Sequence, residues 1–325
     1  MKKLLLISLI ILASSLLVAE GQSESADNYP PETLDFVAVG SPGGGWDTTV
    51  RAVVQTLQQT DLVDANMPVR NNPGASGAKH LAEMQKEKGS SRMLLANSSP
   101  LLLNYLSGSS RFSFENTTPL VNLIGDYQVF TVGPDSEFES INEVMDALKK
   151  DPSSVSVCGN STFGSLDHIS FLIFAKAAGV TDIKSINYIS FEDAAEAQVI
   201  GGHVDLLSKG YSEVLGLIDS GDLVPLALTS NEAINGIPSA KEQGIDAFFV
   251  NWRGMFGAPD MPDYAVEYWV GVFEKMVKTD EWKAQLEKYN WADVWIPHDE
   301  YYSFLSETQE NYKGILKELG VLQVQ

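Results

Sequence analysis

The chain has 325 residues, of which 43 are acidic and 22 are basic, so its formal net charge is −21. Such acidity disfavours nucleic acid and anionic membrane surfaces as partners, and an anionic ligand would have to be held by local groups such as backbone N–H clusters. Cys158 is the single cysteine, which excludes an internal disulfide and cysteine-rich metal sites. We expect it to be a small buried side chain.

The first residues have the pattern of a secretory signal peptide. Lys2 and Lys3 precede an apolar run from Leu4 to Leu12, and the small residues of Ala19–Gly21 offer a cleavage site. The apolar run, about 15 residues with its serines, is short for a membrane span. No cysteine lies near its end, so no lipid anchor is expected. The sequence therefore predicts a signal peptide at residues 1–21 and an exported, periplasmic mature protein.

Strand-like and helix-like segments alternate along most of the remaining chain. Strands are expected at 34–39, 68–71, 93–96, 129–132, 155–158, 186–189, 204–207 and 223–228, and helices at 47–59, 75–88, 141–150, 166–178, 194–200 and 214–218. This order predicts α/β domains with mainly parallel sheets. Three more helices, at 262–277, 281–288 and 300–319, are expected to pack on the outside of a domain. Ligands of open α/β sheets bind beyond the carboxyl ends of the strands, so the loops after strands are the candidate site.

The first of these loops runs from Gly40 to Asp47 and contains three consecutive glycines. Because glycine lacks a Cβ atom, a ligand can approach the backbone N–H groups closely, and the following helix adds donors and partial positive charge. Asp47 is a candidate N-cap. The predicted ligand contacts are Ser41, Pro42, Gly43, Gly44, Gly45 and Asp47. The alternative is a tight strand-to-helix turn without a ligand.

Two further loops follow strands and open helices in the same way. The loop from Asn71 to Gly77 would open at the same sheet edge as the first loop, and the loop from Gly159 to His168 carries hydroxyl donors for an anion. The predicted contacts are Asn72, Gly74, Ala75 and Ser76 in one loop and Asn160, Ser161, Thr162, Phe163 and His168 in the other. A structural role for His168 remains an alternative.

Enzyme motifs are mostly absent. The sequence has no G-x-x-x-x-G-K-[ST] phosphate loop, no H-E-x-x-H among its four histidines and no G-x-S-x-G nucleophile motif. No cofactor is expected. A hydrolase that uses Ser76 or Ser161 with His168 stays as an alternative.

The loops, in this order, resemble those of the solute receptors of tripartite tricarboxylate transporters, the Bug-type family. The matching segments include PGGGWDTTVRAV (Pro42 to Val53), NNPGASGAKHLA (Asn71 to Ala82) and NWRGMFGAP (Asn251 to Pro259). The resemblance implies an α/β fold of two domains, a type II periplasmic-binding-protein clamshell with the ligand in the cleft. Domain 1 would comprise residues 29–128 and 254–325, and domain 2 residues 129–253.

The same resemblance implies a function. The chain would be a monomeric receptor, not an enzyme, that captures a small organic carboxylate and delivers it to the permease subunits of the transporter. Partners would be the anion and the permease, with no nucleic acid. A signalling receptor that docks a membrane sensor is an alternative.

The sequence departs from citrate-type members of this family at two places. Phe163 and the loop Ser190-Phe191-Glu192-Asp193 stand where small residues are more usual, which would shrink the pocket. We expect Glu192 and Asp193 to face solvent at a helix N-terminus, and Ser190 and Phe191 to contact the ligand. Lys209 would supply compensating positive charge. These departures keep an amide, an amino acid or an aromatic acid open as ligands. The resemblance implies that the chain crosses between the domains near Asn251 to Phe256, and for Arg253 in this hinge we expect a structural salt bridge.

Overall fold

The computed structural model describes residues 28–191 and 193–323, so the expected signal peptide lies outside the described residues. The strands are β1 (Asp35–Ala38), β2 (Val69–Asn71), β3 (Met93–Ser98), β4 (Thr118–Val132), β5 (Ser156–Gly159), β6 (Asn187–Ser190), β7 (Leu206–Gly210), β8 (Val224–Leu228), β9 (Val250–Gly257) and β10 (Ala292–Ile296). The α-helices are α1 (Gly45–Gln59), α2 (Ala78–Glu83), α3 (Pro100–Leu106), α4 (Ile141–Lys150), α5 (Leu166–Ala177), α6 (Ala195–Ile200), α7 (Tyr211–Asp219), α8 (Asp263–Met276), α9 (Asp280–Tyr289) and α10 (His298–Leu319). Short 3₁₀ helices are η2 (Ala75–Gly77), η3 (Met84–Glu87), η4 (Phe114–Asn116) and η5 (Ile183–Ser185).

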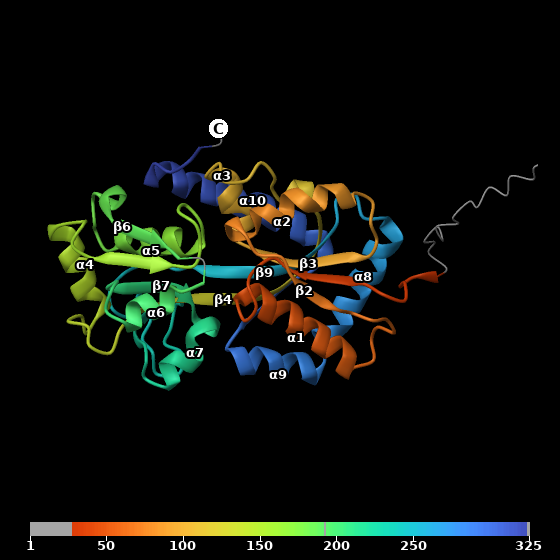
Figure 1. Cartoon of the computed structure of the whole chain (residues 1–325), viewed down its shortest axis with the longest axis horizontal. Helices are drawn as coiled ribbons and strands as arrows, with labels where there is room; N and C mark the ends of the chain where they lie inside the picture. Colours follow the sequence, from red (N-terminus) through yellow and green to blue (C-terminus); the bar gives the residue numbers. More distant parts are fainter. Residues whose placement is uncertain (1–27, 192, 324–325) are drawn as a thin grey trace, which may run out of the picture.

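The chain forms two lobes joined by long strands (Figure 1). The first lobe is built on β1, β2 and β3, with α1, α2, α3, α8 and α9 around them; the second is built on β5, β6, β7 and β8, with α4, α5, α6 and α7. Strand β4 passes between the lobes because its first half pairs with β9 and β10 and its second half with β7 and β8. The domain boundaries at residues 128 and 254 stay a proposal.

The sheet is mixed rather than mainly parallel, so that expectation is wrong for its centre. β1 pairs in parallel with β2 and β3, and β5 with β6 and β7. The strands that cross between the lobes pair antiparallel, as β3–β9, β4–β9 and β4–β7 do. The alternation of elements predicts parallel pairing within each lobe, but it contains no information on strands that return from one lobe to the other.

Local signals place several elements well. Helix α4 has the predicted bounds because the Ser140 hydroxyl accepts from the backbone N–H of Glu143 and lysines stand in the last turn. The single helix predicted at 75–88 is wrong: the segment is η2, α2 and η3. Its start is disrupted because Gly74, Ala75, Ser76 and Gly77 all have positive φ. The pattern also misses α3, β9 and β10.

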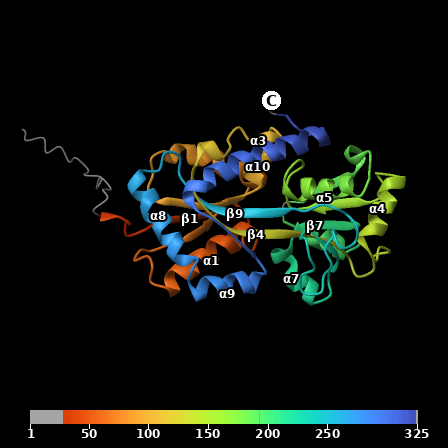
Figure 2. The ribbon, with the colours of Figure 1, turned by 180° about the vertical axis from the view of Figure 1, so that it is seen from behind.

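Hydrophobic side chains form cores on both faces of the sheet. In the first lobe, Phe36 packs edge-on against Trp269 of α8, with ring centroids 5.7 Å apart. A second core continues from one lobe into the other and includes Trp252 of β9 and Tyr301 of α10. As expected, α8 and α9 return to the first lobe, whereas α10 also reaches α5 of the second lobe, where Glu318 pairs with Lys176 (Figure 2).

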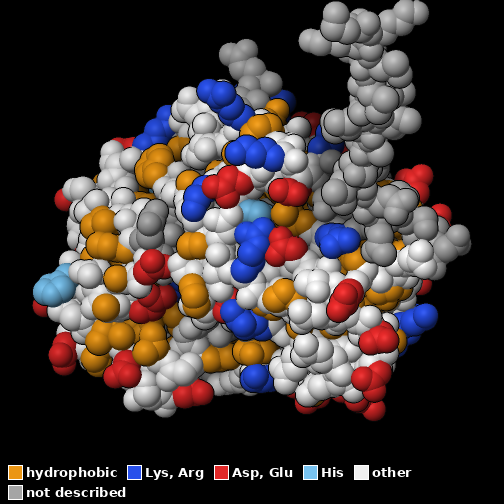
Figure 3. Space-filling model, turned by 45° about the vertical axis from the view of Figure 1, so that its right-hand side comes forward, with side chains coloured by type: hydrophobic (Ala, Val, Ile, Leu, Met, Phe, Trp, Pro, Cys, Tyr) orange, Lys and Arg blue, Asp and Glu red, His pale blue; other side chains and the backbone are white. Residues whose placement is uncertain are grey.

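Cys158 is fully buried, as expected, and burial raises the pKa of its thiol to about 12. On the face that Figure 3 shows, acidic, basic and hydrophobic side chains are interspersed. Across residues 28–191 and 193–323, no helix has the length and apolar character needed to cross a membrane.

Candidate functional site

A cavity of about 770 Å³ lies between the two lobes. Its lining comes from loops of the first lobe, from loops and helix starts of the second, and from β9. The lining residues are Val39, Gly40, Ser41, Pro42, Gly43, Gly44, Gly45, Trp46, Pro73, Gly74, Ala75, Ser76, Gly77, Ser98, Pro100, Asn160, Ser161, Thr162, Leu166, Asp167, Asp193, Glu196, Lys209, Glu213, Asn251 and Arg253. A volume of this size suits a small organic molecule.

The first glycine-rich loop turns directly into α1 at the cavity wall. The Gly44 N–H donates to the Ser41 carbonyl (3.1 Å), and the Gly43 N–H donates to the Asp47 carboxylate (2.9 Å). Asp47 also pairs with Arg51 at 2.9 Å. Burial alone would raise the pKa of Asp47, but the hydrogen bonds from Arg51 and Gly43 hold it below its ordinary value. Asp47 therefore organises the loop and does not line the cavity.

The second loop presents Ser76 to the other lobe. Ala75 and Ser76 have φ values of 49° and 48°, a left-handed backbone that costs energy for residues with a Cβ atom. The Asn104 side chain donates to the Ser76 carbonyl at 2.9 Å and supports this conformation. The Ser76 hydroxyl in turn accepts from the Thr162 N–H at 3.0 Å, across the cavity. Asn72 instead donates to Glu83 at 2.7 Å and lies outside the lining.

The donors of the third loop are largely taken by Asp167. Its carboxylate accepts from the backbone N–H groups of Asn160 (3.0 Å) and Ser161 (2.9 Å), and the Ser161 hydroxyl accepts from the Asp167 N–H (2.7 Å). Asp167 is 4% exposed, and burial raises its pKa to about 6, although Lys209 opposes the shift. The Asp167 carboxylate thus already takes the backbone donors of this loop that could otherwise hold a ligand anion.

His168 and Phe163 lie behind this loop rather than in the cavity lining. The buried His168 ring lies between Phe163 and Tyr188, with centroids at 4.3 and 4.5 Å, and its Nδ1 accepts from the Gly164 N–H at 3.0 Å. Burial lowers the pKa of His168 to about 4, so the ring is neutral at pH 7. Phe163 is 59% exposed.

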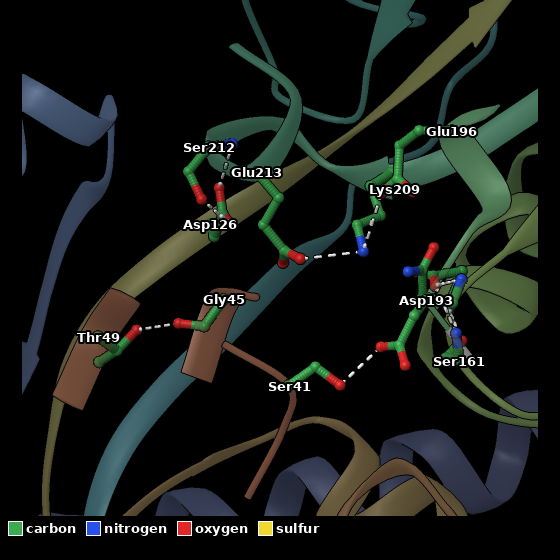
Figure 4. A network of polar contacts seen from close by, with 12 residues as sticks. Ser41, Gly45, Thr49, Asp126, Ser161, Asp193, Glu196, Lys209, Ser212 and Glu213 are labelled. Atoms are coloured by element: carbon green, nitrogen blue, oxygen red, sulfur yellow. Dashed lines mark hydrogen bonds and ion pairs between the residues drawn. The ribbon is translucent and has the colours of Figure 1, made fainter. Parts of the chain in front are cut away.

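A chain of ion pairs forms one side of the cavity, and Figure 4 shows its part around Lys209, Glu213 and Glu196. The Arg253 guanidinium contacts Asp126 at 2.7 Å and Glu213 at 2.9 Å. Lys209, itself 7% exposed, contacts Glu213 at 3.1 Å and Glu196 at 3.4 Å. Burial would lower the pKa of Lys209, but the two glutamates raise it above its ordinary value. The expected salt bridge of Arg253 is therefore present, and Lys209 is a buried, paired cation.

Asp193 closes the cavity from the second lobe. The Ser41 hydroxyl of the first lobe donates to the Asp193 carboxylate at 2.6 Å. Asp193 is exposed just ahead of α6, as expected, and it also lines the cavity. Glu192 lies outside the described residues.

The structure brings together most of the predicted site residues. Those that line the cavity are Ser41, Pro42, Gly43, Gly44, Gly45, Gly74, Ala75, Ser76, Asn160, Ser161, Thr162 and Lys209. Those outside the lining are Asp47, Asn72, Phe163, His168, Ser190 and Phe191. Ligand contact by any of them stays a prediction.

Sequence reasoning missed three of the four acidic lining residues, namely Asp167, Glu196 and Glu213. One signal was available, because Lys209 and Glu213 are four residues apart at the junction of β7 and α7. A charged pair with this spacing inside an otherwise apolar segment indicates a buried ion pair.

The described residues do not support catalysis by the proposed serines. Ser76 contacts Thr162, and Ser161 contacts Asp167, while the Nδ1 of His168 accepts from Gly164. A serine nucleophile needs a base within hydrogen-bond reach. Within residues 28–191 and 193–323, no group of three or more His, Cys, Asp or Glu side chains could hold a metal ion.

Comparison with known proteins identifies one family. The sequence profile described as "Tripartite tricarboxylate transporter family receptor" matches residues 52–321. Protein BugT of Bordetella pertussis is 27% identical over 234 residues, which are 69% of this chain and 69% of BugT.

Solved structures share the fold at low sequence identity. MatC from Rhodopseudomonas palustris with bound malate is 15% identical, with a TM-score of 0.77 over 89% of this chain and 100% of that chain. The R. palustris protein Rpa4515 with adipate is 15% identical, with a TM-score of 0.82 over 91% of this chain and 100% of that chain. The periplasmic binding protein BugD is 17% identical, with a TM-score of 0.80 over 91% of this chain and 100% of that chain, so the fold is that of a type II periplasmic-binding-protein clamshell.

Proposed function

We propose that this chain, which belongs to the tripartite tricarboxylate transporter receptor family, captures a small organic carboxylate between its two lobes and delivers it to a membrane permease of that type. The family is one of solute-binding receptors, not of enzymes. The observation that carries the proposal is the cavity between the lobes, lined by the glycine-rich loop at the start of α1. The dipole of a 15-residue helix favours a negative charge near its N-terminus.

The ligands of two related folds support an organic acid. The MatC structure holds malate and the Rpa4515 structure holds adipate. Both are small organic acids, which agrees with the dimensions of the cavity between the lobes.

Contacts across the cavity support a receptor that closes around its ligand. Ser41 reaches Asp193 at 2.6 Å, and Thr162 reaches Ser76 at 3.0 Å, so the lobes touch at two sides of the cavity. A ligand that binds the closed arrangement better than an open one would shift the population towards closure. We further propose that the chain is exported through residues 1–21, acts as a monomer and divides into domains at residues 128 and 254.

The test is thermal unfolding of the mature chain with di- and tricarboxylates, aromatic acids, amino acids and amides. A ligand at a hundredfold excess over Kd stabilises the native state by about 2.7 kcal/mol, so a bound acid raises the unfolding temperature. Ser41→Trp places an indole in the cavity and should abolish this rise. Ser109→Trp, on an exposed serine of the first lobe, should retain it. An equal rise in Ser41→Trp, or none with any acid, would overturn the proposal.

A further inference from the structure

Helix α3 carries a buried asparagine that supports the strained turn beside the cavity. Asn104 is 2% exposed, and its side-chain amide donates to the Ser76 carbonyl at 2.9 Å and, more weakly, to the Ala75 carbonyl at 3.5 Å. Its Oδ1 atom is buried and meets no hydrogen-bond partner among the described residues. An unpaired buried polar atom costs stability, so the bonds that Asn104 donates are what favours an amide at this position.

The turn that Asn104 supports has a backbone that residues with a side chain rarely adopt. Ala75 and Ser76 have φ values of 49° and 48°, and they stand between Gly74 and Gly77, which also have positive φ. Two consecutive left-handed residues with Cβ atoms cost energy and persist only where neighbouring groups hold them. The two carbonyls that Asn104 binds belong to this left-handed pair. Asn104 therefore stabilises the strained turn against a relaxed one.

The same turn carries the hydroxyl that contacts the second lobe. The Ser76 hydroxyl accepts from the Thr162 N–H at 3.0 Å and lies 3.3 Å from the Thr162 hydroxyl. Ser76 has φ and ψ values of 48° and 44°, and these backbone angles determine where its side chain can point. A relaxed turn would therefore move the hydroxyl away from Thr162, so the contact between the lobes depends on the left-handed backbone.

The end of α3 meets this loop of the second lobe directly. Gly164 lies two residues beyond Thr162, and a Cβ atom on it would lie 3.1 Å from the Cβ atom of Ser107, the residue that ends α3. The close approach and the φ value of 79° both favour glycine at this position. Asn104 and Ser107 thus place α3 against both partners of the contact, the Ser76 turn in the first lobe and the Thr162 loop in the second.

We propose that Asn104 is a positioning residue for closure of the two lobes: it holds Ala75 and Ser76 in the left-handed region so that the Ser76 hydroxyl meets the Thr162 N–H. Asn104 lies outside the cavity lining, so it acts through Ser76 and not on a solute. Loss of its amide relaxes the turn and breaks the contact between the lobes at this side of the cavity. Slower escape of a captured solute is the consequence, and this consequence alone rests on the proposed function.

The test is amide hydrogen exchange of the mature chain, followed residue by residue by NMR without any added solute. Asn104→Leu keeps the branched shape of the side chain and removes its donors. The protection factor of the Thr162 N–H should fall about tenfold, the effect of losing one hydrogen bond of ordinary strength. The Ser161 N–H is the internal reference, because it donates to Asp167 within the second lobe and should keep its protection.

Asn122→Leu is the matched control. Asn122 of β4 is fully buried, donates to the carbonyls of Ile124 and Val294 at 3.2 and 2.6 Å, and also has a buried Oδ1 atom without a partner among the described residues. Its substitution should lower the free energy of unfolding and leave the protection of Thr162 at the parent value. Asn104→Ala, which leaves space instead of filling it, should repeat the loss at Thr162 and serves if the leucine variant does not fold.

Glycine at position 75 provides a readout that a purely structural role of Asn104 would not change. Glycine adopts the φ value of 49° without strain, so Ala75→Gly in the Asn104→Leu background should restore part of the Thr162 protection. The proposal would be overturned by unchanged Thr162 protection in Asn104→Leu, by an equal loss in Asn122→Leu, or by no recovery with Ala75→Gly. Because the experiment contains no solute, these outcomes leave the receptor function intact, and the thermal screen tests that function separately.

Discussion

The two lobes line the same cavity with different chemistry. The first lobe contributes small residues and backbone, from Gly40 to Trp46 and from Pro73 to Gly77, with hydroxyls such as Ser41. The second lobe contributes carboxylates and Lys209, several of them buried. A backbone wall accepts many ligands of suitable shape, whereas fixed charges discriminate by charge. Under the proposed function, we therefore expect the first lobe to contribute to general capture and the second lobe to select the ligand.

The largest expected loss of stability comes from substitution of Arg253, which forms ion pairs with two carboxylates beside the cavity. Arg253 is 1% exposed and pairs with Asp126 and Glu213. Arg253→Met would remove this cation from both carboxylates. Removing one partner of a buried ion pair costs about 3–5 kcal/mol, because the remaining charge stays buried. Urea unfolding of the variant should show a loss of this size in the free energy of unfolding.

Arg70→Met is the matched control in the first lobe. Arg70 pairs with Asp35 at 2.7 Å, but its side chain is 45% exposed. Exposed pairs contribute about 0.2–1 kcal/mol, so this variant should be only slightly destabilised. If both variants lost the same free energy of unfolding, the buried ion pairs of Arg253 would contribute no more to stability than the exposed pair of Arg70. The proposed contrast between the two lobes would then be wrong.

A smaller effect is expected where the glycine loop meets the charged side. A Cβ atom on Gly45 would collide with the side chains of Arg253 and Glu213, so Gly45→Ala should displace this pair. Overpacking of this kind costs about 1–3 kcal/mol. Gly271→Ala on α8 meets nothing within 4 Å and should stabilise the protein by about 0.5–1 kcal/mol, because alanine favours the helix. If Gly45→Ala left the stability unchanged, the glycine-rich loop and the ion pairs of Arg253 would adjust independently of each other.

The same contrast explains what the sequence could predict. The glycine-rich loop after β1 is a local signal, because a run of glycines between a strand and a helix already specifies an exposed backbone. The sequence therefore predicted the first-lobe lining residues Ser41 to Gly45 and Gly74 to Ser76. Asp126 and Glu213 are far apart in the chain, and only the crossing of β4 between the lobes brings both to Arg253.

Two predicted loop residues lie outside the cavity lining for a similar physical reason. The side chains of Asp47 and Asn72 bond within the first lobe, Asp47 with Gly43 and Asn72 with Glu83. Short polar side chains in loops often satisfy nearby backbone and side-chain groups first. Their direction depends on those neighbours, which spacing along the chain does not reveal.

The smallest expected effect concerns the pH dependence of stability. The adjacent residues Asp167 and His168 of the second lobe should contribute to it with opposite signs. Burial lowers the pKa of His168 to about 4, below its unfolded value near 6.5, so its contribution to stability is lost as the pH falls below about 6.5. Burial raises the pKa of Asp167 to about 6, above its unfolded value near 3.9, so folding takes up a proton and stability rises as the pH falls through 6. Between pH 7 and about pH 5.5, each change amounts to about 1 kcal/mol, with opposite sign.

Urea unfolding at the two pH values separates these contributions. His168→Asn keeps an acceptor for the Gly164 N–H and removes the titrating ring, so the variant should gain stability relative to the parent at the lower pH. Asp167→Asn removes the opposing carboxylate, so that variant should lose stability more steeply on acidification than the parent. Changes of the same sign in both variants would contradict the assignment. Because Asp167 lines the cavity and His168 lies behind it, opposite changes would also show that burial in this lobe shifts the pKa values of both an acid and a base beside the cavity.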